Sequence, residues 1–244
     1  MWKAKLYLEK IINIFFPLLC AGCGKQIETN SLFCAECQKS IQVITSPLCH
    51  LCGQPFSLKY TSTHICGECL KNPPFFKAAR AVFLYTAPIK NTIIQFKFKN
   101  NTALTNDLAK ILLFHLQDFL KKVNPEIVIP VPLHIKRLRE RGYNQCLLLA
   151  QRIAKYLKIP YEKTVLKKIK PTLPQVGLSQ TQRRKNVKGS FTVTHPFLIK
   201  EKRILLIDDV FTTGSTVNEC AKVLHKAGAS GVWVATLART GNVV

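Results

Sequence analysis

The chain has 244 residues, of which 47% are hydrophobic, so it can bury one large core or two smaller ones. No segment is expected to span a membrane, because the N-terminal apolar run from Ile11 to Leu19 is broken by Asn13 and Pro17 and falls short of the roughly 18–20 residues required. The formal charge of +23, of which +19 falls on residues 78–244, favours a polyanionic partner such as nucleic acid, pyrophosphate or an acidic membrane surface. A merely solvated basic surface is the alternative.

The apolar run at the N-terminus predicts an amphipathic helix that packs against the next domain, with weak contact to a membrane surface as the alternative. It lacks the Ala-x-Ala-like cleavage site of a signal peptide. We therefore expect a cytoplasmic protein, either free or peripheral to the inner face of the membrane.

Eight of the ten cysteines form four Cys-x-x-Cys pairs, separated by 10, 11 and 13 residues. Each such turn points two thiolates at one ion, and two turns complete a tetrahedral zinc site. The sequence therefore predicts two structural Zn²⁺ ions. Sequential pairing of the turns closes the shortest loops, but the other pairings remain open. The pairs are Cys20/Cys23, Cys34/Cys37, Cys49/Cys52 and Cys66/Cys69.

Other interpretations of these cysteines fit less well. A disulfide scaffold would suit a secreted chain, and a redox Cys-x-x-Cys motif usually occurs once, near a βαβ pattern. His50 and His64 lie near the turns, but eight thiolates already suffice for two closed sites. Cys146 and Cys220 fall on apolar helix faces, so we expect them in the core.

After Pro73-Pro74 the pattern changes to alternating strands and helices, which predicts a mostly parallel sheet with helices on both faces. We therefore divide the chain into a zinc module, residues 1–72, and an α/β domain, residues 73–244. Ligands of such sheets bind beyond the carboxyl ends of the strands. The predicted strands are 81–85, 127–130, 165–169, 190–193, 204–207 and 232–235, and the predicted helices are 89–98, 107–123, 145–157 and 215–227.

The helix over 89–98 ends in Phe96-Lys97-Phe98-Lys99, which alternates aromatic rings with cations. Surfaces that stack the bases of single-stranded DNA have this composition. We favour the other interpretation, in which two core phenylalanines are flanked by lysines that reach towards solvent.

Two segments of the α/β domain are strongly basic, and the first of them follows the predicted strand 127–130. Between Lys136 and Arg141 four of six residues are cations, and arginine offers planar, forked donors that suit phosphate. The stretch from Lys163 to Lys188 holds eight Lys or Arg and no Asp or Glu, and its prolines predict a long irregular excursion. Long basic loops in a compact domain are usually functional. For the first segment, a solvated basic turn is the less favoured alternative.

The most informative stretch runs from Arg203 to Thr216. Four apolar residues end in Asp208 and Asp209, and a small, hydroxyl-rich segment then leads into an amphipathic run. This pattern predicts a buried strand, a tight loop and a helix N-terminus, whose unpaired N–H groups bind phosphate. The two carboxylates are placed to hold ribose hydroxyls, or a cation beside them. The predicted phosphate-binding residues are Thr212, Thr213, Gly214, Ser215 and Thr216.

The series Asp-Asp, two residues, then Thr-Thr-Gly-x-Thr resembles the phosphoribosyl-pyrophosphate (PRPP) motif of type I phosphoribosyltransferases. The resemblance implies that fold, PRPP with Mg²⁺ as ligand, and Asp208 and Asp209 as the catalytic carboxylates. It also implies pyrophosphate contact by Arg137 and Arg141, and a mobile basic loop, carrying Arg183 and Arg184, that closes over PRPP.

Together with the paired Cys-x-x-Cys turns and the Arg-Gly-Tyr-Asn-Gln run at 141–145, these segments resemble the ComF family of competence-associated proteins over nearly the whole chain. Members of that family have a phosphoribosyltransferase-like domain and are linked to DNA uptake and natural transformation. The resemblance implies single-stranded DNA and import proteins at the inner membrane as partners.

Three functions remain open at this point. The first is a pentosyltransferase that transfers phosphoribosyl to an unidentified acceptor. The second is a single-stranded-DNA-binding module in which PRPP is a ligand and not a substrate, and the third is a structural adaptor of the import machinery that does not need PRPP.

Overall fold

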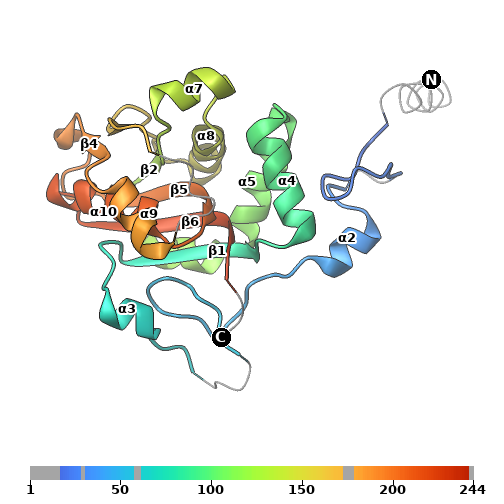
Figure 1. The fold of residues 1–244 in the computed structure, drawn as a ribbon, viewed down its shortest axis with the longest axis horizontal. Coiled ribbons are helices and arrows are strands. Elements are labelled where there is room, and N and C mark those ends of the chain that lie inside the picture. The colour runs from blue at the N-terminus through green and yellow to red at the C-terminus, as the bar shows by residue number, and fades with distance from the viewer. Residues whose placement is uncertain (1–16, 29–30, 58–61, 173–178, 242–244) are drawn as a thin grey trace.

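The structure, a computed structural model, describes residues 17–28, 31–57, 62–172 and 179–241 (Figure 1). Residues 11–16 of the predicted N-terminal helix lie outside this part of the chain. Within the described residues, no helix is long and apolar enough to cross a membrane.

The core is a four-stranded sheet in the order β1-β6-β5-β2, in which all neighbouring strands are parallel. The central strands β5 and β6 are apolar on both faces, because helices cover the sheet on both sides. The strands are β1 (Ala78–Leu84), β2 (Ile127–Pro130), β5 (Arg203–Phe211) and β6 (Gly231–Arg239).

Alternate residues of β5 belong to two separate cores. Leu205 and Ile207 pack in the core that includes α4 (Ala87–Phe98), α5 (Thr105–His115) and α8 (Gln145–Leu157). Ile204 and Leu206 pack in the core that includes α10 (Ser215–Lys226). The prediction of an α/β sheet with helices on both faces is therefore confirmed.

One predicted helix is wrong, because the structure has two helices in its place. The helix expected over 107–123 is divided at Leu116 into α5 and α6 (Gln117–Val123), because the backbone there leaves helical geometry, with φ −104° and ψ 15°. Leu116 is still buried, so the helical spacing of apolar residues continues across the break. The break therefore cannot be predicted from the spacing of apolar residues in the sequence.

The remaining elements lie around this sheet. The strands β3 and β4 form a separate antiparallel pair, so the expected strands at 165–169 and 190–193 do not join the parallel sheet. These elements are β3 (Leu166–Lys168), β4 (Phe191–Val193), α7 (Ile135–Arg141), α9 (Gln180–Val187), and the short 3-10 helices η1 (Thr102–Leu104) and η2 (Pro196–Leu198).

The zinc module consists of two four-cysteine clusters, each with sulfur atoms within 4.8 Å of one another. The turns pair sequentially: the first two form one cluster and the last two form the other. We call them ribbon 1 and ribbon 2. Their helices, α2 (Ala35–Ser40) and α3 (Gly67–Lys71), each begin directly after a ligand cysteine and lie on opposite sides of the molecule (Figure 1).

The two ribbons dock on different parts of the α/β domain. Ribbon 1 lies against α4, where the Thr92 hydroxyl donates to the Ala21 carbonyl at 3.0 Å, and Ala21 and Phe33 are buried in the same core as α4 and α8. Between the ribbons, the chain runs along the edge of β1: Ile44 N–H donates to Val82 O and Leu84 N–H donates to Gln42 O, both at 2.9 Å. Ribbon 2 is joined to β1 by the Ala79 N–H, which donates to Leu51 O at 2.7 Å. Both ribbons are thus attached to the sheet domain.

Candidate functional site

The acidic pair lies within β5 and not beyond its end, which corrects the predicted strand. Pairing with β6 continues past the carboxylates, with Asp208 opposite Thr236 and Phe211 opposite Arg239. Successive strand residues point to opposite faces, so the two carboxylates have different surroundings. Apolar residues after the pair, Val210 and Phe211, carry the strand further than the first apolar run indicates.

The loop after β5 has the geometry that its composition predicts. Gly214 is the N-cap of α10 and has φ +74°, in the left-handed region. A Cβ at this position would lie 2.5 Å from Cζ of Phe211, so glycine is required for space as well as for conformation. The hydroxyls of Thr213 and Ser215 are 2.8 Å apart at the first turn of α10, where free N–H groups favour an anion.

Replacing Gly214 is expected to cost stability in two separable ways. Gly142 has nearly the same backbone, with φ +79°, but open space where a Cβ would lie. Gly142→Ala should therefore show only the cost of the left-handed conformation, about 1 kcal/mol. Gly214→Ala should add about 1–2 kcal/mol for the collision with Phe211. Urea denaturation of the two variants checks this, and equal losses would contradict it.

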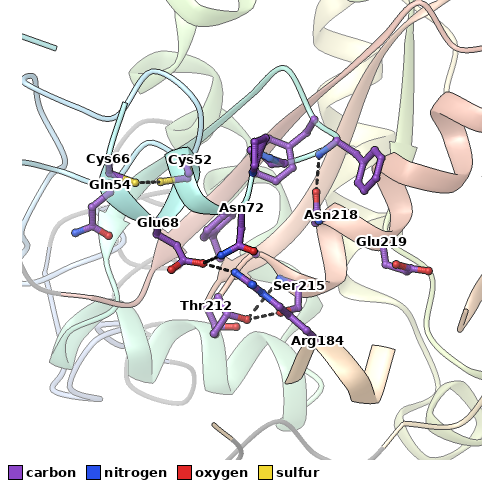
Figure 2. Close-up of a pocket in the computed structure, with 18 of the residues that line it drawn as sticks. Cys52, Gln54, Cys66, Glu68, Asn72, Arg184, Thr212, Ser215, Asn218 and Glu219 are labelled. Atoms are coloured by element: carbon purple, nitrogen blue, oxygen red, sulfur yellow. Dashed lines mark hydrogen bonds and ion pairs between the residues drawn. The ribbon is translucent and has the colours of Figure 1, made fainter. Parts of the chain in front are cut away.

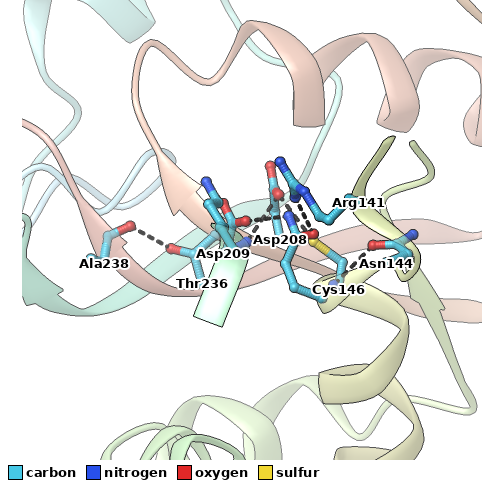
Figure 3. Close-up of polar contacts among 9 residues, drawn as sticks. Arg141, Asn144, Cys146, Asp208, Asp209, Thr236 and Ala238 are labelled. Atoms are coloured by element: carbon cyan, nitrogen blue, oxygen red, sulfur yellow. Dashed lines mark hydrogen bonds and ion pairs between the residues drawn. The ribbon is translucent and has the colours of Figure 1, made fainter. Parts of the chain in front are cut away.

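Asp209 is held in a buried network (Figure 3). Its residue is 3% exposed, and its two oxygens contact the Lys97 ammonium at 2.8 Å and the Gln145 amide at 2.5 Å. The Arg141 guanidinium donates in turn to the Gln145 side-chain oxygen at 2.5 Å. Lys97 of α4 and Gln145 of α8 thus contact this carboxylate of β5 directly, and Arg141 of α7 acts on it through Gln145.

Asp208 is partly buried and has fewer charged partners. It accepts hydrogen bonds from the Cys146 thiol at 3.4 Å and from the Asp209 N–H at 2.9 Å. Burial, and then the neighbouring charge of Asp209, raise the pKa of Asp208 to about 7, although Lys97 acts in the opposite direction. Burial and the two carboxylates also raise the pKa of Cys146, which is therefore a neutral thiol donor. Cys146 is buried as expected, but it belongs to this site as well.

The three side chains Cys146, Asp208 and Asp209 place their ligand atoms within 4.8 Å of one another, as a cation site would. The two oxygens of Asp209 already contact Lys97 and Gln145, so a cation here would be repelled by an ammonium 2.8 Å from its ligand oxygen. The arrangement fits a hydrogen-bonding carboxylate pair better than a metal site. Sequence reasoning missed the roles of Lys97 and Gln145, although both lie in runs that composition singled out.

The first basic segment forms a short helix, α7, and not a loop. His134 caps its start, accepting from Lys136 N–H at 3.3 Å, and Gly142 ends it. Arg137 and Arg141 line a small cavity of about 180 Å³. The other residues around this cavity are Lys97, Phe98, Asn100, Glu140 and Tyr143.

The aromatic and basic run at the end of α4 is only partly as expected. Phe96 is fully buried, but Phe98 is 64% exposed, and the Arg141 guanidinium lies 4.8 Å from the centre of its ring. Lys97 does not reach towards solvent, because the buried Asp209 attracts it. Phe98 is therefore a surface residue beside the small cavity.

A larger cleft of about 900 Å³ lies between the loop after β5, α9 and ribbon 2. Figure 2 shows Arg184 of α9 directed at Glu68 of α3, with which it forms an ion pair, and Thr212 and Ser215 beside them. Arg183 lies on the same helix but is not among the residues lining the cleft. The second basic segment thus meets both the loop and a zinc ribbon.

The Lys163–Lys188 segment is more regular than expected. Part of it forms β3, and residues 180–187 form α9, which begins with a capping box between Ser179 and Gln182. The Ser-x-x-Gln signature of that box was present in the sequence. Residues 173–178 lie outside the described part of the chain.

Ribbon 2 is fixed to the sheet by Arg239, a residue that no sequence pattern marked. Its guanidinium donates to Cys52 O at 2.7 Å and to the Gln54 side-chain oxygen at 2.5 Å. Burial lowers the pKa of Arg239, while the ribbon cysteines act against that shift. One wall of the cleft is therefore positioned by the last residue of β6.

Comparison with known proteins agrees with this architecture. Residues 11–70 match the double zinc ribbon domain family and residues 143–242 match the phosphoribosyl transferase domain family. The chain is thus a double-zinc-ribbon protein with a domain of the phosphoribosyltransferase type.

Relatives that match most of the chain identify a particular family within this class of proteins. Competence protein F of Haemophilus influenzae is 37% identical over 235 residues, which cover 92% of this chain and 98% of the relative. The DNA utilization protein YhgH of Escherichia coli O157:H7 is 32% identical and covers 85% of this chain and 90% of its own length. Competence protein ComFC of Bacillus subtilis is 27% identical, with coverage of 85% and 84%. The chain belongs to the ComF family of competence proteins.

Proposed function

We propose that this protein binds PRPP with Mg²⁺ at the end of β5 and acts in DNA uptake during natural transformation. The observation that carries the proposal is the loop from Thr212 to Thr216: its glycine, its hydroxyl pair and the start of α10 come together directly after β5, the strand that carries Asp208 and Asp209. The names of the relatives, which refer to competence and DNA utilization, support the biological role.

In this proposal each part of PRPP meets a group that suits it. The 5-phosphate occupies the N-terminus of α10, and Asp208 accepts hydrogen bonds from ribose hydroxyls. The pyrophosphate faces the small cavity with Arg137 and Arg141. Mg²⁺, which proteins usually bind together with substrate phosphates, would offset part of the negative charge of the pyrophosphate.

If the protein is a pentosyltransferase, its contribution is positioning and electrostatics. Asp208 stabilises the positive charge that develops on the ribose when the bond to pyrophosphate breaks, and the arginines stabilise the leaving group. An acceptor amine then attacks the anomeric carbon. The 900 Å³ cleft between the loop and ribbon 2 has room for such an acceptor.

The alternative function, binding of single-stranded DNA with PRPP as a ligand, is favoured by the lining of the same cleft. Among the described residues, Lys71, Lys185, Lys188 and Lys222 line it without a carboxylate within 4.0 Å of their ammonium groups. The Lys222 ammonium lies 5.6 Å from the centre of the Phe75 ring, which is half exposed. Cations beside an aromatic ring suit a nucleic acid strand.

A calorimetric titration of PRPP with Mg²⁺, with and without a single-stranded oligonucleotide, tests both functions. Asp208→Asn should weaken PRPP binding about tenfold to a hundredfold, because it removes a charged hydrogen-bond acceptor. Asp118→Asn, an exposed acid on α6, is the matched control and should leave binding unchanged.

The outcomes separate the functions. Heat with PRPP and turnover of an added acceptor support the enzyme. PRPP binding without turnover, joined to oligonucleotide binding with a steep salt dependence, supports the DNA-binding module. If the titration of wild-type protein with Mg²⁺–PRPP shows no binding, the proposal is refuted, and the structural adaptor remains as the function.

A further inference from the structure

Lys97 is a buried cation that the proposed chemistry does not yet explain. It projects from α4 with a side chain 20% exposed, and among the described residues its ion-pair partner is Asp209, at 2.8 Å. Burial works to lower the pKa of Lys97, but attraction to Asp209 outweighs it, so that the pKa lies above its ordinary value. The same side chain forms part of the wall of the small cavity with Arg137 and Arg141.

Each of the two oxygens of Asp209 already contacts a buried protein group. Lys97 occupies one oxygen, and Gln145, which is itself 3% exposed, occupies the other. Gln145 cannot turn away freely, because Arg141 holds its side-chain oxygen at 2.5 Å. The network therefore fixes Asp209 from two sides.

Asp208 differs from its neighbour in this respect. Its described partners are the Cys146 thiol and a backbone N–H, both at the same oxygen, Oδ1. Among the described residues no hydrogen bond reaches its other oxygen, Oδ2, so Asp208 has a whole oxygen available for a ligand, whereas both oxygens of Asp209 are in contact with the protein. Of the two adjacent acids, one is held by the protein and the other can receive hydroxyl groups.

The negative charge of the ligand explains why Asp209 needs a cationic partner such as Lys97. PRPP is strongly anionic, and two uncompensated carboxylates at its ribose would repel it. A buried carboxylate left without its cationic partner is also costly and tends to take up a proton. The ammonium of Lys97 cancels one of the two charges without occupying the space of the ligand.

We propose that Lys97 is a positioning residue for the sugar phosphate. It acts through Asp209: it neutralises and fixes that carboxylate, so that Asp208 alone faces the ribose. The inference rests on the proposed PRPP site, and it gives the two members of the acidic pair different roles.

A double-mutant cycle on Mg²⁺–PRPP affinity, measured by calorimetry, tests the inference. Lys97→Met should weaken binding roughly tenfold to a hundredfold, the range of coupling between contacting residues. In an Asp209→Asn background the same change should have little effect, because no charge remains for the lysine to cancel. Lys97→Arg, which keeps the charge, should restore most of the affinity lost in Lys97→Met.

Controls keep the result interpretable. Lys90→Met lies on the same helix at an exposed position and should bind PRPP as the wild type does. If Lys97→Met does not fold, the Lys97→Met/Asp209→Asn double variant, which has no unpaired charge, should fold and bind as Asp209→Asn does.

Two results would overturn the inference while wild-type protein still binds PRPP. One is a Lys97→Met variant with lower thermal stability but affinity within twofold of wild type, since the role would then be structural only. The other is a pair of single-variant losses that simply add in the double variant, since Lys97 would then act independently of Asp209. Wild-type protein without PRPP affinity would remove the proposed function itself.

Discussion

Removal of zinc is expected to unfold both ribbons and to destabilise the α/β domain to which they are attached. Structural zinc contributes on the order of 10 kcal/mol in small cysteine sites, which is comparable with the whole stability of a typical domain. Ala21, Phe33 and Cys37 of ribbon 1 belong to the main core, so losing their positions would expose part of α4 and of its neighbours. Two zinc ions per chain should be released by a strong chelator, with a large fall in melting temperature.

Single-site variants show how much of the lost stability comes from each ribbon. Cys23→Ser and Cys66→Ser each remove one ligand, from ribbon 1 and ribbon 2 respectively, and should each lower the zinc content from two ions to one. Cys220→Ala is the matched control, because Cys220 is buried but lies outside both clusters. The expectation fails if chelation leaves the melting temperature unchanged, or if the control loses zinc.

Asp208→Asn is expected to make the protein more stable at pH 8 while it weakens PRPP binding. The pKa of Asp208 is raised from 3.8 to about 7 by burial and by Asp209, so the folded chain keeps a proton that the unfolded chain has released. Stability therefore falls as pH rises from about 4 to about 7, and the loss is complete above the folded pKa. Asparagine has no such proton, and the gain at pH 8 should be on the order of 3 kcal/mol.

Urea denaturation of wild type and Asp208→Asn across this pH range measures the difference. The gain should shrink steadily from pH 8 towards pH 5, whereas effects of acid on the zinc thiolates are common to both proteins and cancel. A variant that is less stable than wild type by the same amount at every pH would contradict the raised pKa.

Local patterns in the sequence predict the elements whose cause is local. The strand Ile127–Pro130 and the helix Gln145–Leu157 have the bounds that apolar runs and periodicity indicate. The cysteine spacing predicts two four-cysteine sites, because each Cys-x-x-Cys turn places its own ligands. The phosphate loop likewise depends on neighbouring residues, above all on the glycine before α10.

Features that arise from distant contacts could not be predicted in this way. Only the pairing of β5 with β6 places the acidic pair inside a strand. From the sequence alone Lys97 would be assigned to the surface, and only the fold places the buried carboxylate of Asp209 beside it. Arg239 would likewise be assigned only to the end of a strand, and its contact with ribbon 2 depends on how that ribbon packs. These residues act across the sheet, so their roles depend on tertiary structure.

The segment between the ribbons also affects how the protein behaves when zinc is scarce, because it covers an edge of the sheet. A sheet edge with free N–H and C=O groups is a template for pairing with another chain, and proteins usually cover or disrupt such edges. Here residues 42–44 cover part of β1, and the ribbons on either side hold them in place. Loss of zinc would release that cover and leave a strand edge open to a second molecule. Metal-starved protein should therefore self-associate, in proportion to its concentration, before its sheet unfolds.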